Sequence, residues 1–401
     1  QLQSEQVLGI CTAAGSPTAH SSLIANMKGI PAIVGIGSQI LQIRPNTPIA
    51  IDGSTGQVWI EPNQEQLGEL EARQNQFQQL ESSREWDLEP ITTDGYQISL
   101  MANIIGVSDA QYAIDCGASG VGLLRTEFLY LDRLSPPSEE EQLEIYQAIA
   151  EIMDTRPLTI RTLDIGGDKP VPYLKLAKET NPFLGWRGIR QSLEFHEMLK
   201  TQFRAILRAS VGHKIEIMFP MVSSVHEVRA AKVILAEVER ELSEAGIEFN
   251  QEIPVGIMVE VPAAAIMAHQ LGGEVSFFSI GTNDLSQYIM AADRTNPKVA
   301  SLADGFEPAV LRTIQQTVVA GRVRGISVRV CGQMASDPAA IPILLGLGVD
   351  ELSVNPPAMS AVMATISSLS MTEAEAIATE VLQLESSRAV RELVFNRLFV
   401  E

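Results

Sequence analysis

Two arginines, Arg125 and Arg161, recur at equivalent places on adjacent strand-like runs of this sequence, and two more lie nearby at Arg187 and Arg294. Burying a single arginine is costly unless it meets an anion, so one alone is most often part of a structural ion pair. Four that converge favour a ligand, because forked guanidinium groups fit phosphate and carboxylate oxygens. In a chain whose formal net charge is −20, this gathering predicts a small, highly anionic ligand.

Two carboxylates, Glu260 and Asp284, lie at the ends of consecutive predicted strands. A lone carboxylate in such a place is more often a helix cap or an ion-pair partner. A pair beside the arginines favours Mg²⁺, which takes hard oxygen ligands and is commonly held by one or two carboxylates plus substrate oxygens. Asn283, next to Asp284, can donate a hydrogen bond to a substrate carboxylate without adding charge.

Cys331 and His20 could carry a proton or a phosphoryl group. Cys331 ends another strand-like run; a free cysteine is usually a small buried hydrophobe, but beside a phosphate and metal site it is a candidate general acid. His20 follows a Gly-Ser-Pro-Thr-Ala loop and opens a helical stretch, where free N–H groups and the positive helix end would bind an added phosphate. A structural histidine is the alternative. The other histidines show no paired spacing and receive no role: His196, His213, His226 and His269.

Beyond residue 89, short β-branched runs alternate with helix-length segments. The runs are Ile98–Ile104, Gly120–Phe128, Leu158–Ile165, Ile215–Val222, Val255–Val261, Val275–Gly281, Ile326–Cys331 and Glu351–Asn355. This α/β rhythm predicts a (β/α)8 barrel of the TIM type, with a doubly wound sheet carrying insertions as the alternative. The carboxyl ends of barrel strands hold active sites, and the candidate residues fall at these ends.

The chain divides by composition into three parts. Residues 1–62 predict a small β/α unit with strands at Val7–Cys11, Ala32–Val34, Pro48–Ile51 and Gln57–Ile60, too thin a core for an independent domain. Residues 63–88 are rich in Gln and Glu and predict a helical linker, either a hinge or a plain solvated helix. Residues 89–401 hold the barrel, and 372–400 predict one or two helices that cap it or form a subunit contact.

The composition of the chain limits the kinds of partner and compartment that we expect for it. A net charge of −20 and a pI near 4.7 make the chain a poor match for nucleic acid or an anionic membrane. Three cysteines without a C-x-x-C pattern predict neither a disulfide framework nor a zinc site, as expected in a reducing compartment. No signal peptide and no membrane-spanning apolar run is visible, so we expect a cytoplasmic location.

Blocks along nearly the whole chain resemble enzyme I of the bacterial phosphoenolpyruvate-dependent sugar phosphotransferase system, the phosphoenolpyruvate–protein phosphotransferase family. In order they are GVGLLRTEFLYLDR, IRTLDIGGDK, NPFLGWRGIR, IMFPM, GIMVEVPAA, FFSIGTNDLSQY, AADRTNP and VCGQMASDP. Phosphoenolpyruvate synthase and pyruvate phosphate dikinase share the histidine domain and barrel and are the nearest rivals. A non-catalytic regulatory paralogue is a rival of another class.

The resemblance implies a role for each candidate. His20 would carry the phosphoryl group on Nε2, in a swivelling domain. Phosphoenolpyruvate would be bound by Arg125, Arg161, Arg294, Asn283 and Asp284, with Arg187 supporting its phosphate. Glu260 and Asp284 would bind Mg²⁺, and Cys331 would protonate the enolate to give pyruvate.

The sequence also departs from the family pattern. Ala19 stands where serine is usual, Gln333 where glutamate is usual, and Ser353–Pro357 differs from the usual serine-rich loop. The helical domain that docks the carrier protein HPr is absent, as is the start of the histidine domain, so we expect a fragment of a longer chain. The resemblance implies an HPr-like partner bound through that missing or separate domain, and a homodimer formed through the barrel.

Overall fold

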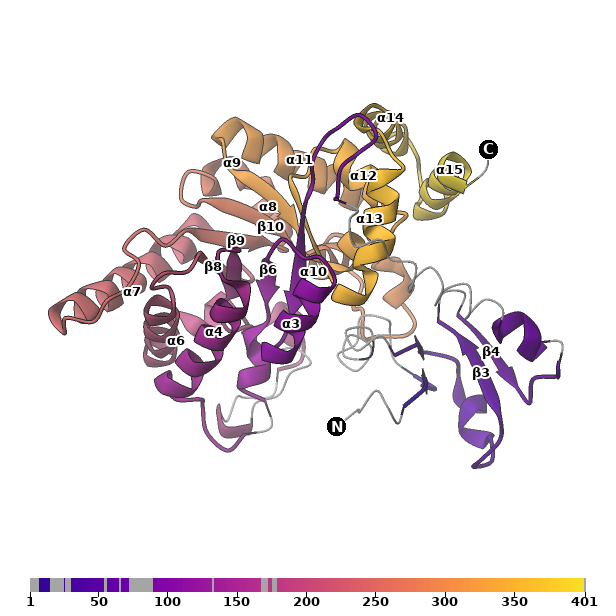
Figure 1. The fold of residues 1–401 in the computed structure, drawn as a ribbon, viewed down its shortest axis with the longest axis horizontal. Coiled ribbons are helices and arrows are strands. Elements are labelled where there is room, and N and C mark those ends of the chain that lie inside the picture. Colours follow the sequence, from indigo (N-terminus) through magenta and orange to yellow (C-terminus); the bar gives the residue numbers. More distant parts are fainter. Residues whose placement is uncertain are drawn as a thin grey trace. The chain divides into compact units, whose positions relative to one another are not determined.

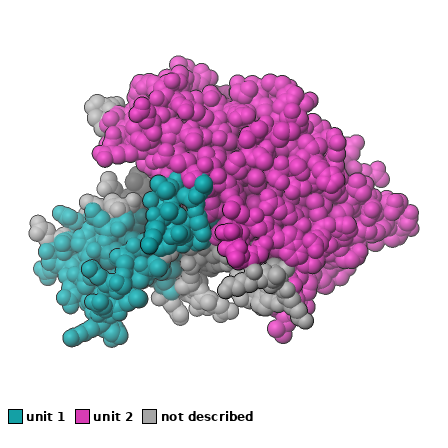
Figure 2. All heavy atoms as spheres, turned by 180° about the vertical axis from the view of Figure 1, so that it is seen from behind, with its two compact units in different colours: residues 1–88, 291–303 teal, residues 89–290, 304–401 magenta. Residues whose placement is uncertain are grey.

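The computed structural model describes residues 7–14, 25, 30–53, 56–64, 66–71, 89–131, 133–166, 172–174 and 179–399. The chain divides into two compact units, residues 1–88 with 291–303, and residues 89–290 with 304–401 (Figure 2). The segment 291–303, predicted to belong with the barrel, groups with the first unit. The predicted boundaries at 62 and 88 stay predictions, and His20 lies outside the described residues.

The second unit is a closed barrel of eight parallel strands surrounded by helices, which confirms the predicted fold (Figure 1). Its strands are β5 (Ser99–Ile104), β6 (Val121–Leu124), β7 (Leu158–Arg161), β8 (Ile215–Phe219), β9 (Val255–Val259), β10 (Phe277–Ile280), β11 (Ser327–Val330) and β12 (Glu351–Val354). They follow one another around the barrel in chain order, and β12 closes it against β5. Each strand lies inside one predicted run.

Several runs extend beyond the strand they contain. The run Leu158–Ile165, for example, pairs with its neighbour only as far as Arg161. The residues that follow are buried although they are no longer paired as a strand, including Asp164 at 1% exposure. These surplus residues form the rim of the barrel, which is where the candidate site residues lie.

Helices cover the outside of the barrel through their apolar faces (Figure 1). Those of the barrel unit are α3 (Val107–Asp115), α4 (Glu139–Met153), α5 (Ile189–Ser192), α6 (His196–Ala209), α7 (Val225–Glu244), α8 (Pro262–Ile266), α9 (Ala268–Leu271), α10 (Thr282–Ile289), α11 (Pro308–Arg324), α12 (Ile341–Gly346), α13 (Met359–Ser367), α14 (Met371–Val381) and α15 (Ser387–Phe399). A capping box starts α4: Ser138 Oγ accepts from the Glu141 N–H, and Glu141 Oε2 accepts from the Ser138 N–H. The helices predicted within 372–400 are α14 and α15, and α14 packs against α12. None of the described helices is both long and apolar enough to cross a membrane.

The first unit holds short strands in the predicted places. Strand β1 (Ile10–Cys11) pairs in parallel with β2 (Ala32–Ile33). Strand β3 (Ile49–Asp52) pairs antiparallel with β4 (Gln57–Ile60), and the 3₁₀ helix η1 (Ser38–Gln42) connects the two pairs. Most side chains of these strands are partly exposed, as expected for a thin core.

A charged layer crosses the barrel near the amino ends of its strands. Arg329 binds both carboxylate oxygens of Glu216, its Nη2 lying 3.0 Å from Oε1, and its Nε lies 3.4 Å from Glu351 Oε1. The same guanidinium lies over the Phe277 ring, 4.1 Å from the centroid. Burial raises the pKa of Glu351 to about 7, although Arg329 opposes the rise. One arginine therefore compensates two carboxylates that are mostly, though not fully, buried.

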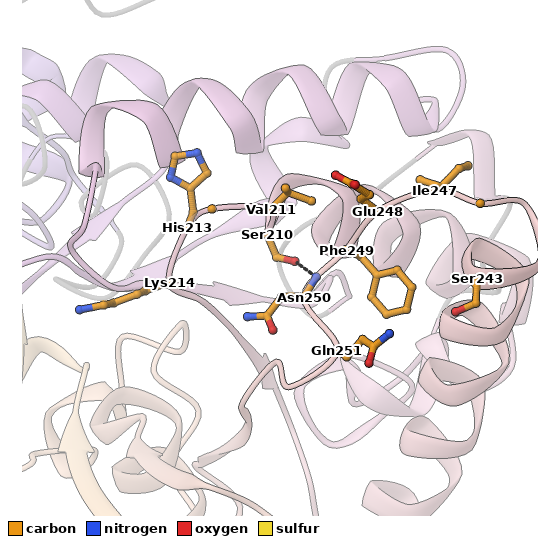
Figure 3. A pocket seen from close by; sticks show the side chains of 12 residues that line it. Ser210, Val211, His213, Lys214, Ser243, Ile247, Glu248, Phe249, Asn250 and Gln251 are labelled. Carbon is orange, nitrogen blue, oxygen red and sulfur yellow. Dashed lines mark hydrogen bonds between the residues drawn. The ribbon is translucent and has the colours of Figure 1, made fainter.

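A pocket of about 730 Å³ lies outside this end of the barrel (Figure 3). The loops 210–214 and 246–251, which precede β8 and β9, line it, and the Ser210 Oγ accepts from the Asn250 N–H at 3.0 Å. Because these loops enter the strands at their amino ends, the pocket lies at the end of the barrel opposite to the candidate site residues.

The charged layer generates a stability prediction. Replacing Arg329 by methionine leaves Glu216 and Glu351 without their shared cation. Removing one partner of a buried ion pair costs about 3–5 kcal/mol, so we expect Arg329→Met to lower the free energy of unfolding by this order at pH 8. The loss should be smaller at pH 5, where Glu351 already carries a proton. Urea unfolding followed by circular dichroism measures both values.

The control is Arg388→Met, which removes an exposed ion pair with Glu392. We expect it to cost less than about 1 kcal/mol. Equal losses for the two variants would contradict a structural role for the buried layer.

Candidate active site

Arg161 is the last residue of β7 and is only 5% exposed. Its Nη2 donates to both oxygens of Glu127, at 2.9 and 3.0 Å, and its Nη1 lies 3.2 Å from Asp164 Oδ2. Burial alone would lower the pKa of Arg161, but Glu127, Asp164 and Glu260 raise it above its ordinary value. The guanidinium is therefore charged, and its two acidic partners fix its orientation.

Arg125 occupies the matching place on the neighbouring strand. Leu124 in β6 pairs with Ile160 in β7, so Arg125 and Arg161 each lie one residue further along their chains. The Arg125 N–H still donates to the Ile104 carbonyl of β5, at 2.9 Å, which holds its backbone against the barrel. The predicted equivalence of these two arginines is therefore present in the strand register.

Arg187 connects two carboxylates from different elements, Asp164 after β7 and Asp284 in the first turn of α10. Its Nε and Nη2 donate to the two oxygens of Asp164, at 3.2 and 2.9 Å, and its Nη1 donates to Asp284 Oδ1 at 3.1 Å. Asp164 thus binds Arg161 and Arg187 together, and Arg187 ties Asp164 to Asp284. Gly166 permits this approach, because a Cβ there would lie 2.7 Å from the Arg187 Cβ and its φ is +110°.

Glu260 follows β9 and is 1% exposed. Its Oε1 accepts from the Met221 N–H at 2.7 Å. Burial, followed by the negative charges of Asp284 and Asp164, raises its pKa to about 8. The positive charges near this carboxylate are too few to stabilise its ionised form. A bound cation would favour that form.

The carboxylates fit a hard divalent cation. Within the described residues, no group of three or more His, Cys, Asp or Glu side chains has the geometry of a complete metal site. Mg²⁺ does not require one, since it is commonly held by one or two carboxylates together with substrate oxygens and water. Glu260 and Asp284, which interact electrostatically at the barrel rim, are suited to that kind of site.

Cys331 follows β11 and lies in an apolar cluster inside the barrel with Leu123, Met218, Met258 and Phe277. Burial raises the pKa of its thiol to about 11, so the thiol keeps its proton at neutral pH. The cluster reaches the charged residues, because Met258 Sδ accepts from Arg161 Nη1 at 3.5 Å. The thiol therefore lies at the boundary between an apolar floor and the charged rim.

The structure brings most of the predicted site residues together. Arg161, Arg187, Asp284 and Glu260 interact through the contacts and charges described above, and Arg125 and Arg161 both affect the Cys331 thiol. Asn283 joins this group because its Oδ1 accepts from the Gln333 N–H at 2.8 Å, which ties the start of α10 to the segment after β11. Arg294 is buried, but its segment groups with the first unit, so its part in the site stays a prediction, as does that of His20.

Two carboxylates of the site received no role from the sequence. Asp164 binds both Arg161 and Arg187, and Glu127 binds Arg161 with both oxygens. Both follow strand ends, like Glu260, so the position rule that selected Glu260 could have found them. Arg161 and Arg187 therefore form ion pairs with carboxylates, as expected for a single buried arginine. Both arginines nevertheless lie at the same rim of the barrel.

Comparison with known proteins defines the class. Residues 79–371 match the family described as "PEP-utilising enzyme, PEP-binding domain", and residues 1–56 match "PEP-utilising enzyme, mobile domain". The chain therefore belongs to the phosphoenolpyruvate-utilising enzymes, and its eight-stranded barrel lies within the part that matches their phosphoenolpyruvate-binding domain.

Individual relatives identify the family more narrowly. The chain is 44% identical over 392 residues to the phosphoenolpyruvate-protein phosphotransferase of Geobacillus stearothermophilus, covering 97% of this chain and 68% of the relative. It is 43% identical to the Bacillus subtilis protein of the same name, covering 97% and 69%. The multiphosphoryl transfer protein of Rhodobacter capsulatus is 43% identical, covering 96% and 46%. The chain belongs to the phosphoenolpyruvate–protein phosphotransferase family, which confirms the resemblance seen in the sequence.

The raised pKa of Glu260 generates a pH prediction. The folded chain holds a proton on Glu260 up to about pH 8, whereas an ordinary glutamate releases it near 4.5. The stabilisation that comes from this proton is therefore fully present below pH 4.5, and it is lost as the pH rises through about 8. Without divalent cations, we expect this loss between about pH 5 and 8, at about 1.4 kcal/mol per unit of raised pKa.

Glu260→Gln should remove this part of the pH dependence, since the amide keeps the shape and cannot ionise. Urea midpoints measured at pH 5 and pH 8 in the presence of a chelator give the comparison. Glu244→Gln, at an exposed helix end, is the control and should behave as wild type. An unchanged pH dependence in Glu260→Gln would rule out this assignment.

Proposed function

We propose that this chain transfers a phosphoryl group from phosphoenolpyruvate to its own His20 in an Mg²⁺-dependent reaction, releasing pyruvate as the first step of a phosphotransferase system. The observation that carries the proposal is the buried set of alternating charges Glu127, Arg161, Asp164, Arg187 and Asp284 at the barrel rim. Membership of the phosphoenolpyruvate–protein phosphotransferase family supports the same reaction.

The arginines would bind the substrate anion. Phosphoenolpyruvate carries a phosphate and a carboxylate, and the forks of Arg125, Arg161 and Arg187 suit both groups. Phosphoryl transfer depends mainly on positioning and on neutralising charge, and fixed buried guanidinium groups supply both without reorganising in the reaction. Asn283 would donate to the substrate carboxylate, and Arg294 would complete the set.

Glu260 and Asp284 would hold Mg²⁺ together with substrate oxygens. When bound there, the cation supplies positive charge to the transferring phosphate and to the developing enolate. Asp284 must then share its oxygens between the cation and Arg187, which now donates to it at 3.1 Å. Arg187 would in turn move part of its hydrogen bonding to the substrate phosphate.

His20 Nε2 would attack phosphorus. The P–N bond forms as the P–O bond to the enol oxygen breaks, and the electron pair leaves with the enolate. Cys331, whose buried thiol keeps its proton at neutral pH, would then protonate the methylene carbon to give pyruvate. The thiolate would recover its proton from solvent.

The phosphorylated histidine must then leave the barrel to pass its phosphoryl group on. This requirement favours a swivelling domain for His20 and a downstream carrier of the HPr type. A homodimer formed through the barrel belongs to the same proposal.

The first test is labelling with phosphoenolpyruvate carrying radioactive phosphate, in the presence of Mg²⁺. We expect label on the wild-type chain and none on His20→Ala, because the imidazole is the acceptor. His269→Ala is the control, since His269 lies on the outside of the barrel near Arg324, and it should label as wild type. Label that persists on His20→Ala would contradict the assignment of the acceptor.

The second test separates transfer from protonation. Cys331→Ala keeps the arginines and carboxylates, so we expect the KM for phosphoenolpyruvate to change less than about twofold. Pyruvate formation should fall by about 10²–10⁴, the usual contribution of a positioned general acid. The matched control is Cys116→Ala, which removes a buried thiol outside the site. A normal rate for Cys331→Ala would exclude Cys331 as the proton donor.

A further inference from the structure

Asn103 is a buried polar side chain on β5 that reaches past the neighbouring strand β12 to the end of β11. It is 2% exposed. Its Nδ2 donates to the Ser353 carbonyl at 2.9 Å and to the Cys331 carbonyl at 3.2 Å, with Asn355 Oδ1 at 3.4 Å. One amide therefore contacts β12 and, beyond it, the residue that carries the candidate acid.

The neighbours of Asn103 supply both acceptors and a donor for its amide group. Its Oδ1 accepts from Ser353 Oγ at 2.8 Å, so both ends of the side chain are satisfied. The pairing of β5 with β6 shifts register between Ala102 and Asn103, at the point where the side chain turns inward. Because an unsatisfied buried amide is costly, this full set of partners fixes the side chain in one orientation.

The other side of the Cys331 segment is held by β10 and by the start of α10. The Cys331 N–H donates to the Ile280 carbonyl at 3.1 Å, and the Gln333 N–H donates to Asn283 Oδ1 at 2.8 Å. Gly332 packs so closely that a Cβ there would lie 1.9 Å from Thr282 Oγ1. Residues 331–333 are therefore tied firmly to one neighbour.

On the side of β12, regular pairing of β11 reaches Val330, opposite Leu352. The Cys331 carbonyl lies one residue beyond that last pair, so strand pairing no longer supplies it with a donor. The Asn103 amide is its donor instead. A buried carbonyl without a donor carries the full cost of its lost hydration, so removing the amide favours rotation of the peptide that carries the thiol.

We propose that Asn103 is a positioning residue for Cys331: its side-chain amide fixes the Cys331 carbonyl and so keeps the thiol buried between the apolar cluster and the charged rim. The catalytic consequence rests on the proposed function, since a proton donor must hold its place relative to the reacting carbon. The burial of the thiol does not rest on the proposed function, because it can be measured in the chain without substrate.

The test is Asn103→Leu, which keeps a similar volume and removes the amide. Without substrate, alkylation of each cysteine by iodoacetamide is followed on separated peptides. We expect Cys331 to react about five- to tenfold faster, the equivalent of one lost hydrogen bond. Cys116, buried in the same unit, should react at the wild-type rate, since it reports global opening.

Steady-state kinetics give an independent measurement. Because the Asn103 amide binds the Ser353 and Cys331 carbonyls rather than carrying a charge for the substrate, the KM for phosphoenolpyruvate should stay within about twofold while kcat falls about tenfold. Ser353→Ala is the matched control: it removes the hydroxyl that binds Asn103 Oδ1 and leaves the amide bond to Cys331, so Cys331 alkylation should change less than about twofold.

An unchanged alkylation rate of Cys331 in Asn103→Leu would overturn the proposal. An equal rise at Cys331 and Cys116 would also overturn it, because Asn103 would then serve only global stability. If Asn103→Leu does not fold, Asn103→Asp keeps the size, loses the amide donor and must show the same selective rise. If His20 is not labelled, the proposed function is contradicted. The alkylation result would still test the position of the Cys331 thiol, because it does not depend on the reaction.

Discussion

The burial of opposite charges at one end of the barrel is the constraint on which the candidate site depends. Asp164 binds Arg161 and Arg187, and Arg187 binds Asp284, all at less than 10% exposure. An isolated buried charge would be several kcal/mol too costly, so each of these groups is tolerable only because the next one is present. Removing one member leaves its neighbour uncompensated, which makes the group act as a unit.

The barrel meets this constraint by separating its interior into layers. The charged rim lies beyond the carboxyl ends of the strands, the apolar cluster around Cys331 lies beneath it, and the layer of Arg329, Glu216 and Glu351 lies near the amino ends. The apolar layer keeps the two charged layers apart and lowers the dielectric around both. Burial in this layer also raises the pKa of the thiol to about 11, which strengthens its hold on the proton.

The sequence predicted the parts of this arrangement that follow from periodicity and position. All eight runs contain a barrel strand, and the strand-end rule selected Arg125, Arg161, Glu260 and Asp284. It could not pair Arg187 with Asp164 and Asp284, because these contacts join residues 23 and 97 positions apart. The reach of Asn103 to Cys331 spans 228 positions and crosses a strand, and no local pattern encodes it. His20, Arg294 and the domain boundaries stay predictions, because they depend on the first unit.

The pairing of the arginines bears on how an anion can bind here. Arg161 and Arg187 are already held by carboxylates, so the affinity for a phosphate reflects the difference between its contacts and those that it replaces. Displacing Asp284 from Arg187 would leave that carboxylate beside Glu260, whose pKa is already raised by it. A divalent cation shared by the two carboxylates removes this penalty. On the proposed function, binding of the anion and of the cation at this rim would therefore be mutually favourable, and the coupling would follow from the alternating charges rather than from a separate regulatory site.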